Sequence, residues 1–157
     1  MIDGVMIKEL ITHNDKRGFF REIIKVNDDF FQEGFGQFSI SKMHKGVIKA
    51  WHIHKRQVDW WYAHGGLLKV ALYDTRKGSP TYEKLTELLM GDGQPAQVLR
   101  IPPGVAHGCK CLKGPADLCY ITSRVYDPDD EGRISDIDLE IGYDWLKDGC
   151  KKKQKCK

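Results

Sequence analysis

The feature that most constrains the fold is a succession of short apolar or alternating segments separated by glycine and proline turns. No stretch keeps the 3.6-residue apolar period of a long helix. Short strands with turns at this spacing are typical of a β-sandwich or barrel. The sequence therefore predicts an all-β domain with strands at 7–11, 18–24, 37–43, 48–54, 60–63, 67–74, 82–90, 97–101, 107–112 and 117–125.

Two connections carry local signals of their own. The segment 26–34 can form one short helix that begins at Asn27, a residue type favoured as a helix cap. The sequence His64-Gly65-Gly66 predicts a tight hairpin between the strands on either side.

Length and charge indicate one domain and a distinct C-terminal end. The 157 residues suit a single core. The net charge is +3, but residues 147–157 hold six lysines and one aspartate, which leaves the rest of the chain mildly acidic. We expect a barrel domain at 1–146 and a basic, disordered tail at 147–157. Because the basic residues gather in the tail and not on a folded face, nucleic acid is not an expected partner.

The apolar segments and the cysteine count predict the cellular compartment of the protein. No apolar run approaches the roughly 18 residues that cross a bilayer, and the N-terminal segment lacks the pattern of a signal peptide. The odd count of five cysteines indicates reduced thiols and a cytoplasmic protein with no membrane partner. Cys109 and Cys111 share one face of a strand, but without a second pair they indicate packing more than a zinc site.

Several motifs stand in a fixed order along the chain, and together they are far more specific than any one alone. The chain resembles the dTDP-4-dehydrorhamnose 3,5-epimerase family over about residues 13–145. The matching stretches are DKRGFF (15–20), IKAWH (48–52), VALYDTRKGSPT (70–81), IPPGVAHG (101–108), LCY (118–120), YDP (126–128), and ISDID (134–138) with Trp145.

The resemblance implies a double-stranded β-helix, the cupin or jelly-roll barrel with short helical segments, usually as a homodimer. It also implies an isomerase of deoxysugar and polysaccharide biosynthesis, without a cofactor, that inverts C3, C5 or both in a dTDP-linked 4-keto-6-deoxyhexose. A ketone at C4 acidifies the hydrogens on C3 and C5. One face therefore needs a base and the other an acid, and the enolate between them needs charge stabilisation.

The same resemblance implies roles for individual residues. His52 matches the catalytic base, and an ordinary histidine pKa near ~6.5 suits that task. Tyr120 matches the catalytic acid on the opposite face. The remaining matches imply contacts to the sugar or the nucleotide diphosphate, and they are Arg17, Phe20, Gln37, Lys49, His107 and Tyr126.

Three positions depart from the family pattern. Lys49 replaces an arginine, so a point charge stands where a guanidinium fork is usual. Asp59 falls where the family has the lysine that stabilises the enolate. The aspartate that orients the base beyond the last tryptophan has no clear counterpart, and Asp136 and Asp138 are the candidates to substitute for it.

These departures leave alternatives open. His52, His54, Asp59 and His107 resemble the ligand pattern of metal-binding cupins, and three imidazoles with a carboxylate suit iron, manganese, nickel or zinc. A metal-dependent sugar isomerase or oxygenase is therefore the second interpretation. A ketoisomerase would use the same enolate chemistry, and a non-catalytic sugar-nucleotide binding module is the third interpretation.

Overall fold

The computed structural model describes residues 1–147, which form twelve β-strands. These residues form no helix, and therefore no helix that is long and apolar enough to cross a membrane. The strands are β1 (Met6–Glu9), β2 (His13–Asp15), β3 (Gly18–Phe20), β4 (Gln37–Met43), β5 (Ile48–His54), β6 (Asp59–His64), β7 (Leu67–Asp74), β8 (Leu85–Gly91), β9 (Gln97–Ile101), β10 (Val105–Lys113), β11 (Ala116–Thr122) and β12 (Glu131–Arg133).

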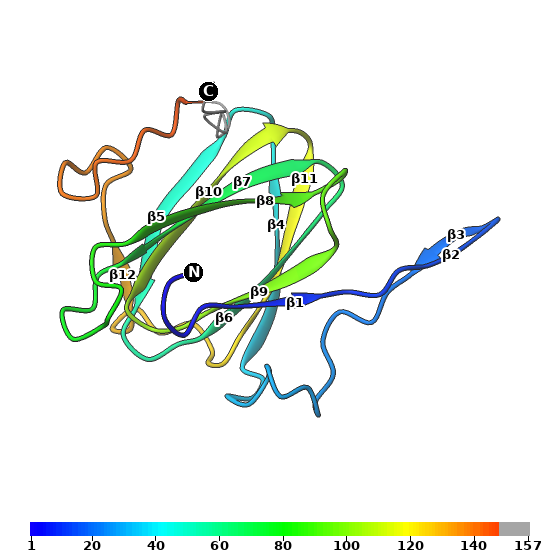
Figure 1. The fold of residues 1–157 in the computed structure, drawn as a ribbon, viewed down its shortest axis with the longest axis horizontal. Helices are drawn as coiled ribbons and strands as arrows, with labels where there is room; N and C mark the ends of the chain where they lie inside the picture. The colour runs from blue at the N-terminus through cyan, green and yellow to red at the C-terminus, as the bar shows by residue number, and fades with distance from the viewer. Residues whose placement is uncertain (148–157) are drawn as a thin grey trace, which may run out of the picture.

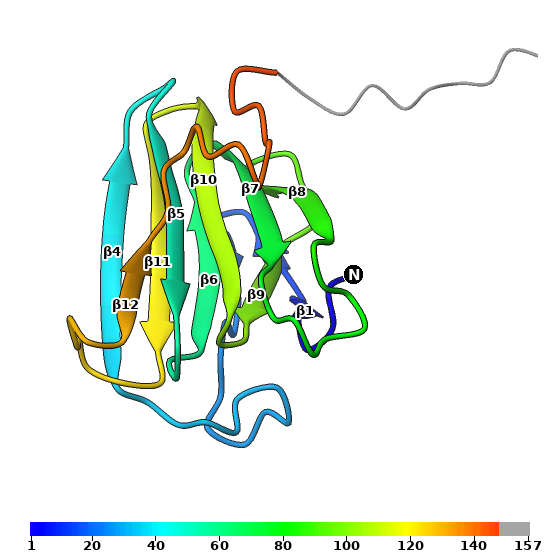
Figure 2. The same ribbon diagram turned by 90° about the vertical axis from the view of Figure 1, so that its left-hand side faces the viewer.

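Ten of these strands form two antiparallel five-stranded sheets that pack face to face (Figures 1 and 2). The first sheet has the order β1-β9-β6-β11-β4, and the second has the order β12-β5-β10-β7-β8. This is the architecture of the expected jelly-roll barrel. Most expected strands form within a few residues of their predicted bounds, although the strand expected at 18–24 is reduced to Gly18–Phe20.

The main core lies between the two sheets. Strand β7 contributes Leu68, Val70 and Leu72, which are fully buried and alternate along the strand, so they share the inward face. Strand β6 contributes Trp61 and strand β9 contributes Leu99 from the opposite sheet. Because this apolar packing fills one end of the space between the sheets, the polar residues of β5, β6 and β10 are left to line the other end.

The helix expected at 26–34 is wrong, because this segment is a series of turns that covers the outer face of the first sheet. Phe30 and Phe31 are buried against Trp60, whose indole nitrogen donates to the carbonyl of Phe30. The carboxylate of Asp28 accepts hydrogen bonds from the Lys25 backbone and the Lys8 side chain. These contacts outweigh a weak local helix preference in so short a segment.

The hairpin expected at His64-Gly65-Gly66 is also wrong. Strand β6 pairs with β9 and β11, whereas β7 pairs with β8 and β10, so the turn carries the chain from one sheet to the other. Gly66 has a φ of 118°, and a Cβ there would lie 2.4 Å from the Lys113 carbonyl oxygen. The glycines therefore permit a close crossing between sheets and not a hairpin turn.

The segment after β12 crosses the outer face of the second sheet (Figure 2). There Trp145 is buried beside Trp51, with ring centroids 5.0 Å apart. Lys69 of β7 donates a hydrogen bond to the backbone carbonyl of Trp145. Most of the basic tail predicted at 147–157 lies outside the described residues.

Candidate active site

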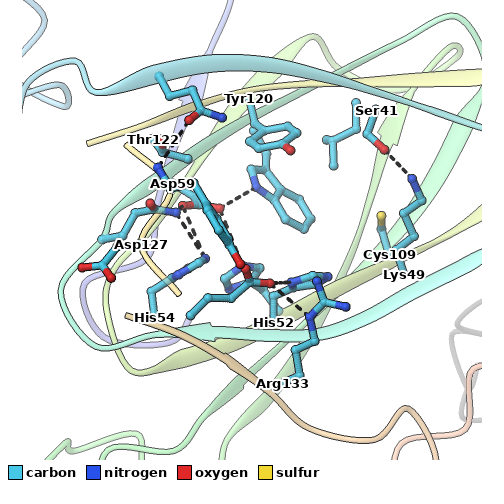
Figure 3. Close-up of a pocket in the computed structure, with 17 residues that line it drawn as sticks. Ser41, Lys49, His52, His54, Asp59, Cys109, Tyr120, Thr122, Asp127 and Arg133 are labelled. Atoms are coloured by element: carbon cyan, nitrogen blue, oxygen red, sulfur yellow. Dashed lines mark hydrogen bonds and ion pairs between the residues drawn. The ribbon is translucent and has the colours of Figure 1, made fainter. Parts of the chain in front are cut away.

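A pocket of about 260 Å³ opens between the two sheets at the polar end of the barrel (Figure 3). Strands β5, β10 and β12 provide one wall, and strands β4, β6 and β11 provide the other. Six of the eight residues predicted for the site line this pocket, namely Gln37, Lys49, His52, His107, Tyr120 and Tyr126.

His52 is held by a carboxylate from the neighbouring strand. Its Nδ1 lies 3.0 Å from Oε1 of Glu131. Since a carboxylate can only accept, Nδ1 carries the proton and Nε2 presents its lone pair to the pocket. Burial alone would oppose ionisation of Glu131, but hydrogen bonds from His52 and Arg133 hold the pKa of its carboxyl below the ordinary value. The pair therefore has the geometry of an oriented general base.

Tyr120 lies on the facing wall of the pocket (Figure 3). Its ring packs against the main core, and within residues 1–147 its hydroxyl makes no hydrogen bond. Gln37 lies on β4 beside it and donates to Oγ of Ser39. Its other amide atom, Oε1, accepts from the Tyr126 backbone, which brings the loop after β11 to the pocket. A phenol thus faces an imidazole across the space where a ligand would lie.

A second group of residues lies deeper in the pocket and is almost inaccessible to solvent. Asp59 is buried, and its carboxylate accepts hydrogen bonds from the Gln57 amide at 2.8 Å and the Trp61 indole at 3.2 Å. Nε2 of His54 lies 3.9 Å from one carboxylate oxygen, and Nε2 of His107 lies 3.7 Å from the other. Burial lowers the pKa of His107 to about 4 despite the attraction of Asp59, so this imidazole is neutral at pH 7.

Similarity to known proteins identifies the family. The model described as dTDP-4-dehydrorhamnose 3,5-epimerase matches residues 1–157. The chain belongs to this family. It is 45% identical to the spore coat polysaccharide biosynthesis protein SpsL of Bacillus subtilis over 148 residues, which cover 92% of this chain and 97% of that protein.

Two further relatives extend the comparison. A probable low-salt glycan biosynthesis epimerase of Haloferax volcanii is 32% identical, with 92% of this chain and 94% of that protein covered. The crystal structure of dTDP-6-deoxy-D-glucose-3,5-epimerase from Legionella pneumophila, in complex with dTDP-4-keto-L-rhamnose, has a TM-score of 0.82 at 28% identity. That match covers 92% of this chain and 80% of the other. The cupin fold expected from the sequence is thereby confirmed.

The carboxylate beside His52 comes from β12 and not from Asp136 or Asp138, the residues predicted to supply it. Neither Asp136 nor Asp138 contacts His52, because Asp136 is exposed and Asp138 accepts from the backbone of the turn that follows it. Glu131 occupies that place instead. Sequence reasoning missed it because no strand was predicted at Glu131–Arg133, and only the pairing of β12 with β5 brings it beside the histidine.

The family departure at Lys49 leaves a cation at the pocket rim. Nζ of Lys49 lies 2.6 Å from Oγ of Ser41, and the exposed Arg133 lies on the neighbouring strand. Arg133 was also missed from the sequence. Two cations at one rim can neutralise a negatively charged ligand, and Arg133 supplies the guanidinium that position 49 lacks.

The last two predicted residues, Arg17 and Phe20, do not reach the pocket of their own chain. They lie on the β2–β3 hairpin, which projects away from the barrel (Figure 1). The Arg17 side chain is 83% exposed and pairs with Asp15, and Phe20 is also exposed. An exposed apolar side chain and an exposed cation on a projecting hairpin are suited to contacts outside this chain.

Proposed function

We propose that this protein inverts C3, C5 or both centres of a dTDP-linked 4-keto-6-deoxyhexose. The observation that carries the proposal is the placement of His52, hydrogen-bonded to Glu131, on one wall of the pocket and Tyr120 on the facing wall. Inversion next to a ketone requires removal of a proton from one face and its return to the other. Family membership and the relatives named as epimerases support the same substrate class.

In this mechanism Nε2 of His52 removes the proton from the carbon next to the ketone. The electron pair moves onto the C4 oxygen and forms the enolate. The electron pair of the enolate then returns to the same carbon, which takes the hydroxyl proton of Tyr120 from the opposite face as the C4 ketone re-forms. Solvent takes the proton from Nε2 of His52 and reprotonates the phenolate. Glu131 acts as a positioning residue, because its carboxylate fixes the tautomer of His52 and stabilises the imidazolium.

The remaining pocket residues would bind and orient the substrate. Lys49 and Arg133 at the rim carry the charge that suits a diphosphate. Gln37 and Tyr126 would contact the sugar, since a hydroxylated ring needs several hydrogen-bonding partners, whereas the free ring nitrogen of the buried His107 faces Asp59.

Proton NMR of dTDP-4-keto-6-deoxyglucose incubated with the protein in D2O tests the function. We expect deuterium to enter at C3, C5 or both, together with signals of the inverted product. A carbonyl that moves from C4 to C3 would instead identify a ketoisomerase. The absence of any solvent exchange would contradict the proposal.

We also propose a homodimer in which the β2–β3 hairpin of each subunit completes the pocket of its partner. The hairpin supports this because Arg17 and Phe20 are exposed and lie apart from their own pocket. Phe38 and Ile40 on the edge strand β4 are also exposed, which gives a second copy an apolar surface to cover.

Complementation between two inactive variants tests this dimer. Arg17→Ala and His52→Ala should each be inactive, but equal mixtures that are unfolded and refolded together should recover about a quarter of the wild-type activity. Half of the mixed dimers are then heterodimers, and each has one intact pocket. Recovery of none of the activity would contradict a shared site.

The compartment is part of the same proposal. The three cysteines among residues 1–147 are free thiols, which fits the reducing cytoplasm that we propose for this enzyme.

A further inference from the structure

We propose that His54, Asp59 and His107 form a binding site for one divalent transition-metal ion, such as Zn²⁺. The three side chains come from β5, β6 and β10 and meet at the buried end of the pocket, where Figure 3 labels His54 and Asp59. One ligand atom from each lies within 4.8 Å of the other two. Two imidazole nitrogens and one carboxylate are a ligand set that catalytic zinc and non-haem iron sites use.

The hydrogen bond at Nδ1 of His107 directs the lone pair of its other ring nitrogen toward Asp59. Nδ1 of His107 donates to the Val105 carbonyl oxygen at 2.9 Å, so Nε2 carries no proton when this histidine is neutral. Within residues 1–147 that Nε2 makes no hydrogen bond, and the Asp59 carboxylate lies 3.7 Å from it. A buried lone pair that faces a carboxylate needs a cation between the two groups to become favourable.

His54 also has one ring nitrogen near an acceptor and the other near Asp59, although in the part of the chain that the structure describes it makes no hydrogen bond through Nδ1. Its Nδ1 faces the carboxylate of Asp130 at 3.9 Å, and its Nε2 faces Asp59. A histidine that binds a metal usually directs its other ring nitrogen to a carboxylate or a backbone carbonyl, and here His54 and His107 have one of each. This outer layer of contacts is difficult to explain as core packing alone, because apolar residues would fill the space at lower cost.

The ligand atoms must move closer together to close the site. Metal bonds of about 2.1 Å set neighbouring ligand atoms roughly 3.0–3.4 Å apart, whereas the three ligand atoms here lie within 4.8 Å of one another. Nε2 of His54 lies 3.9 Å from one oxygen of Asp59, and Nε2 of His107 lies 3.7 Å from the other. The Gln57 amide nitrogen lies 3.2 Å from Nε2 of His54 and would give up that contact, but it keeps its hydrogen bond to Asp59. Three protein ligands leave a coordination position open toward the pocket.

The site also accounts for the missing lysine. This step rests on the proposed epimerase function, in which negative charge develops on the C4 oxygen. Asp59 alone would repel that charge, whereas a bound divalent cation would turn the same position into a stabilising one. His52 lies outside the group of side chains whose ligand atoms come within 4.8 Å of one another, so it remains available as the base.

Co²⁺ binding to the full chain tests the site without any substrate. The protein is stripped with chelator and carries Cys150→Ser and Cys156→Ser, which remove two thiols that would compete for the metal. Titration followed by visible absorption should show one Co²⁺ per chain, displaced by one Zn²⁺. Asp59→Asn and His107→Gln should each weaken Co²⁺ binding by more than about 100-fold, since even outer-layer changes cost 10- to 100-fold. His44→Ala, at an exposed histidine, should bind Co²⁺ normally.

Thermal melts of the protein that keeps Asp59 and His107 check the same site. Added Zn²⁺ should raise its Tm. An absence of saturable binding, or binding that both ligand variants retain, would overturn the proposal. Hydrogen exchange of the keto sugar in D2O is then compared in stripped and Zn²⁺-loaded protein, and equal rates would overturn the catalytic role. If Co²⁺ binds as expected but neither form exchanges the substrate, the metal site stands and the epimerase proposal fails.

Discussion

Two histidines of the same pocket have opposite surroundings. The His52 side chain is 33% exposed and shares its proton with a carboxylate, whereas the His107 side chain is 3% exposed and donates to a backbone carbonyl. The first presents the lone pair of its Nε2 to the pocket. The second stays neutral, because burial lowers its pKa to about 4. The position within one barrel thus decides whether an imidazole is open to the pocket or held neutral by burial.

Replacement of His52 should have the largest effect. We expect His52→Ala to lower kcat by about 10²- to 10⁴-fold, which is the usual contribution of a general base. Initial rates from NMR with the keto sugar give the measurement, and His44→Ala is the matched control at an exposed histidine. Equal rates in the wild type and His52→Ala would remove the distinction between the two histidines.

Glu131→Gln, which changes the hydrogen-bond partner of His52, should have a smaller effect than His52→Ala. Glutamine keeps the shape but cannot stabilise the imidazolium, so we expect kcat to fall about 100-fold, less than the ~10⁴-fold loss for a fully buried triad carboxylate. KM should stay nearly unchanged, and Glu131→Asp should recover part of kcat. A change confined to KM would indicate a role in binding instead of positioning.

Asp74→Asn tests a buried carboxylate that lies outside the pocket. Asp74 is as buried as Asp59, but its carboxylate is surrounded by donors from Arg76, Ser79 and Thr81. Burial would raise its pKa, yet these donors hold it well below the ordinary value. Catalysis should be unchanged, while the free energy of unfolding at pH 7 falls by about 3 kcal/mol, as for other broken buried ion pairs.

The pH dependence of that loss follows from the sign of the shift. Because the folded protein binds the Asp74 proton more weakly than the unfolded chain, this stabilisation is complete above about pH 5 and declines as the pH falls through 4. Urea unfolding of wild type and Asp74→Asn should therefore converge in acid. A difference that stays constant from pH 7 to pH 3 would contradict the ion-pair explanation.

The sequence predicted the elements that depend on local pattern and missed those that depend on distant pairing. Alternation along 37–43 and the stop at Pro102-Pro103 were enough to predict β4 and β9. The shared orientation of His52 and His54 toward the pocket followed from strand geometry. Glu131 and Arg133 could not be found in this way, because their three-residue strand exists only by pairing with β5.

The turns at 26–34 and 64–66 show the same limit. The first has the cap and length of a helix, but Phe30 and Phe31 are used to cover Trp60. The second has hairpin residues, but its strands pair with other partners. In both cases long-range burial decides between two local structures of nearly equal stability.

The central claim is that base and acid act from opposite walls, and Tyr120→Phe in D2O tests it most directly. His52 would still remove the proton, while the facing donor is gone. The account predicts deuterium at C3 or C5 of recovered, uninverted substrate, with net inversion reduced by about 100-fold or more. Loss of exchange and inversion to the same extent, or wild-type inversion without the phenol, would contradict it.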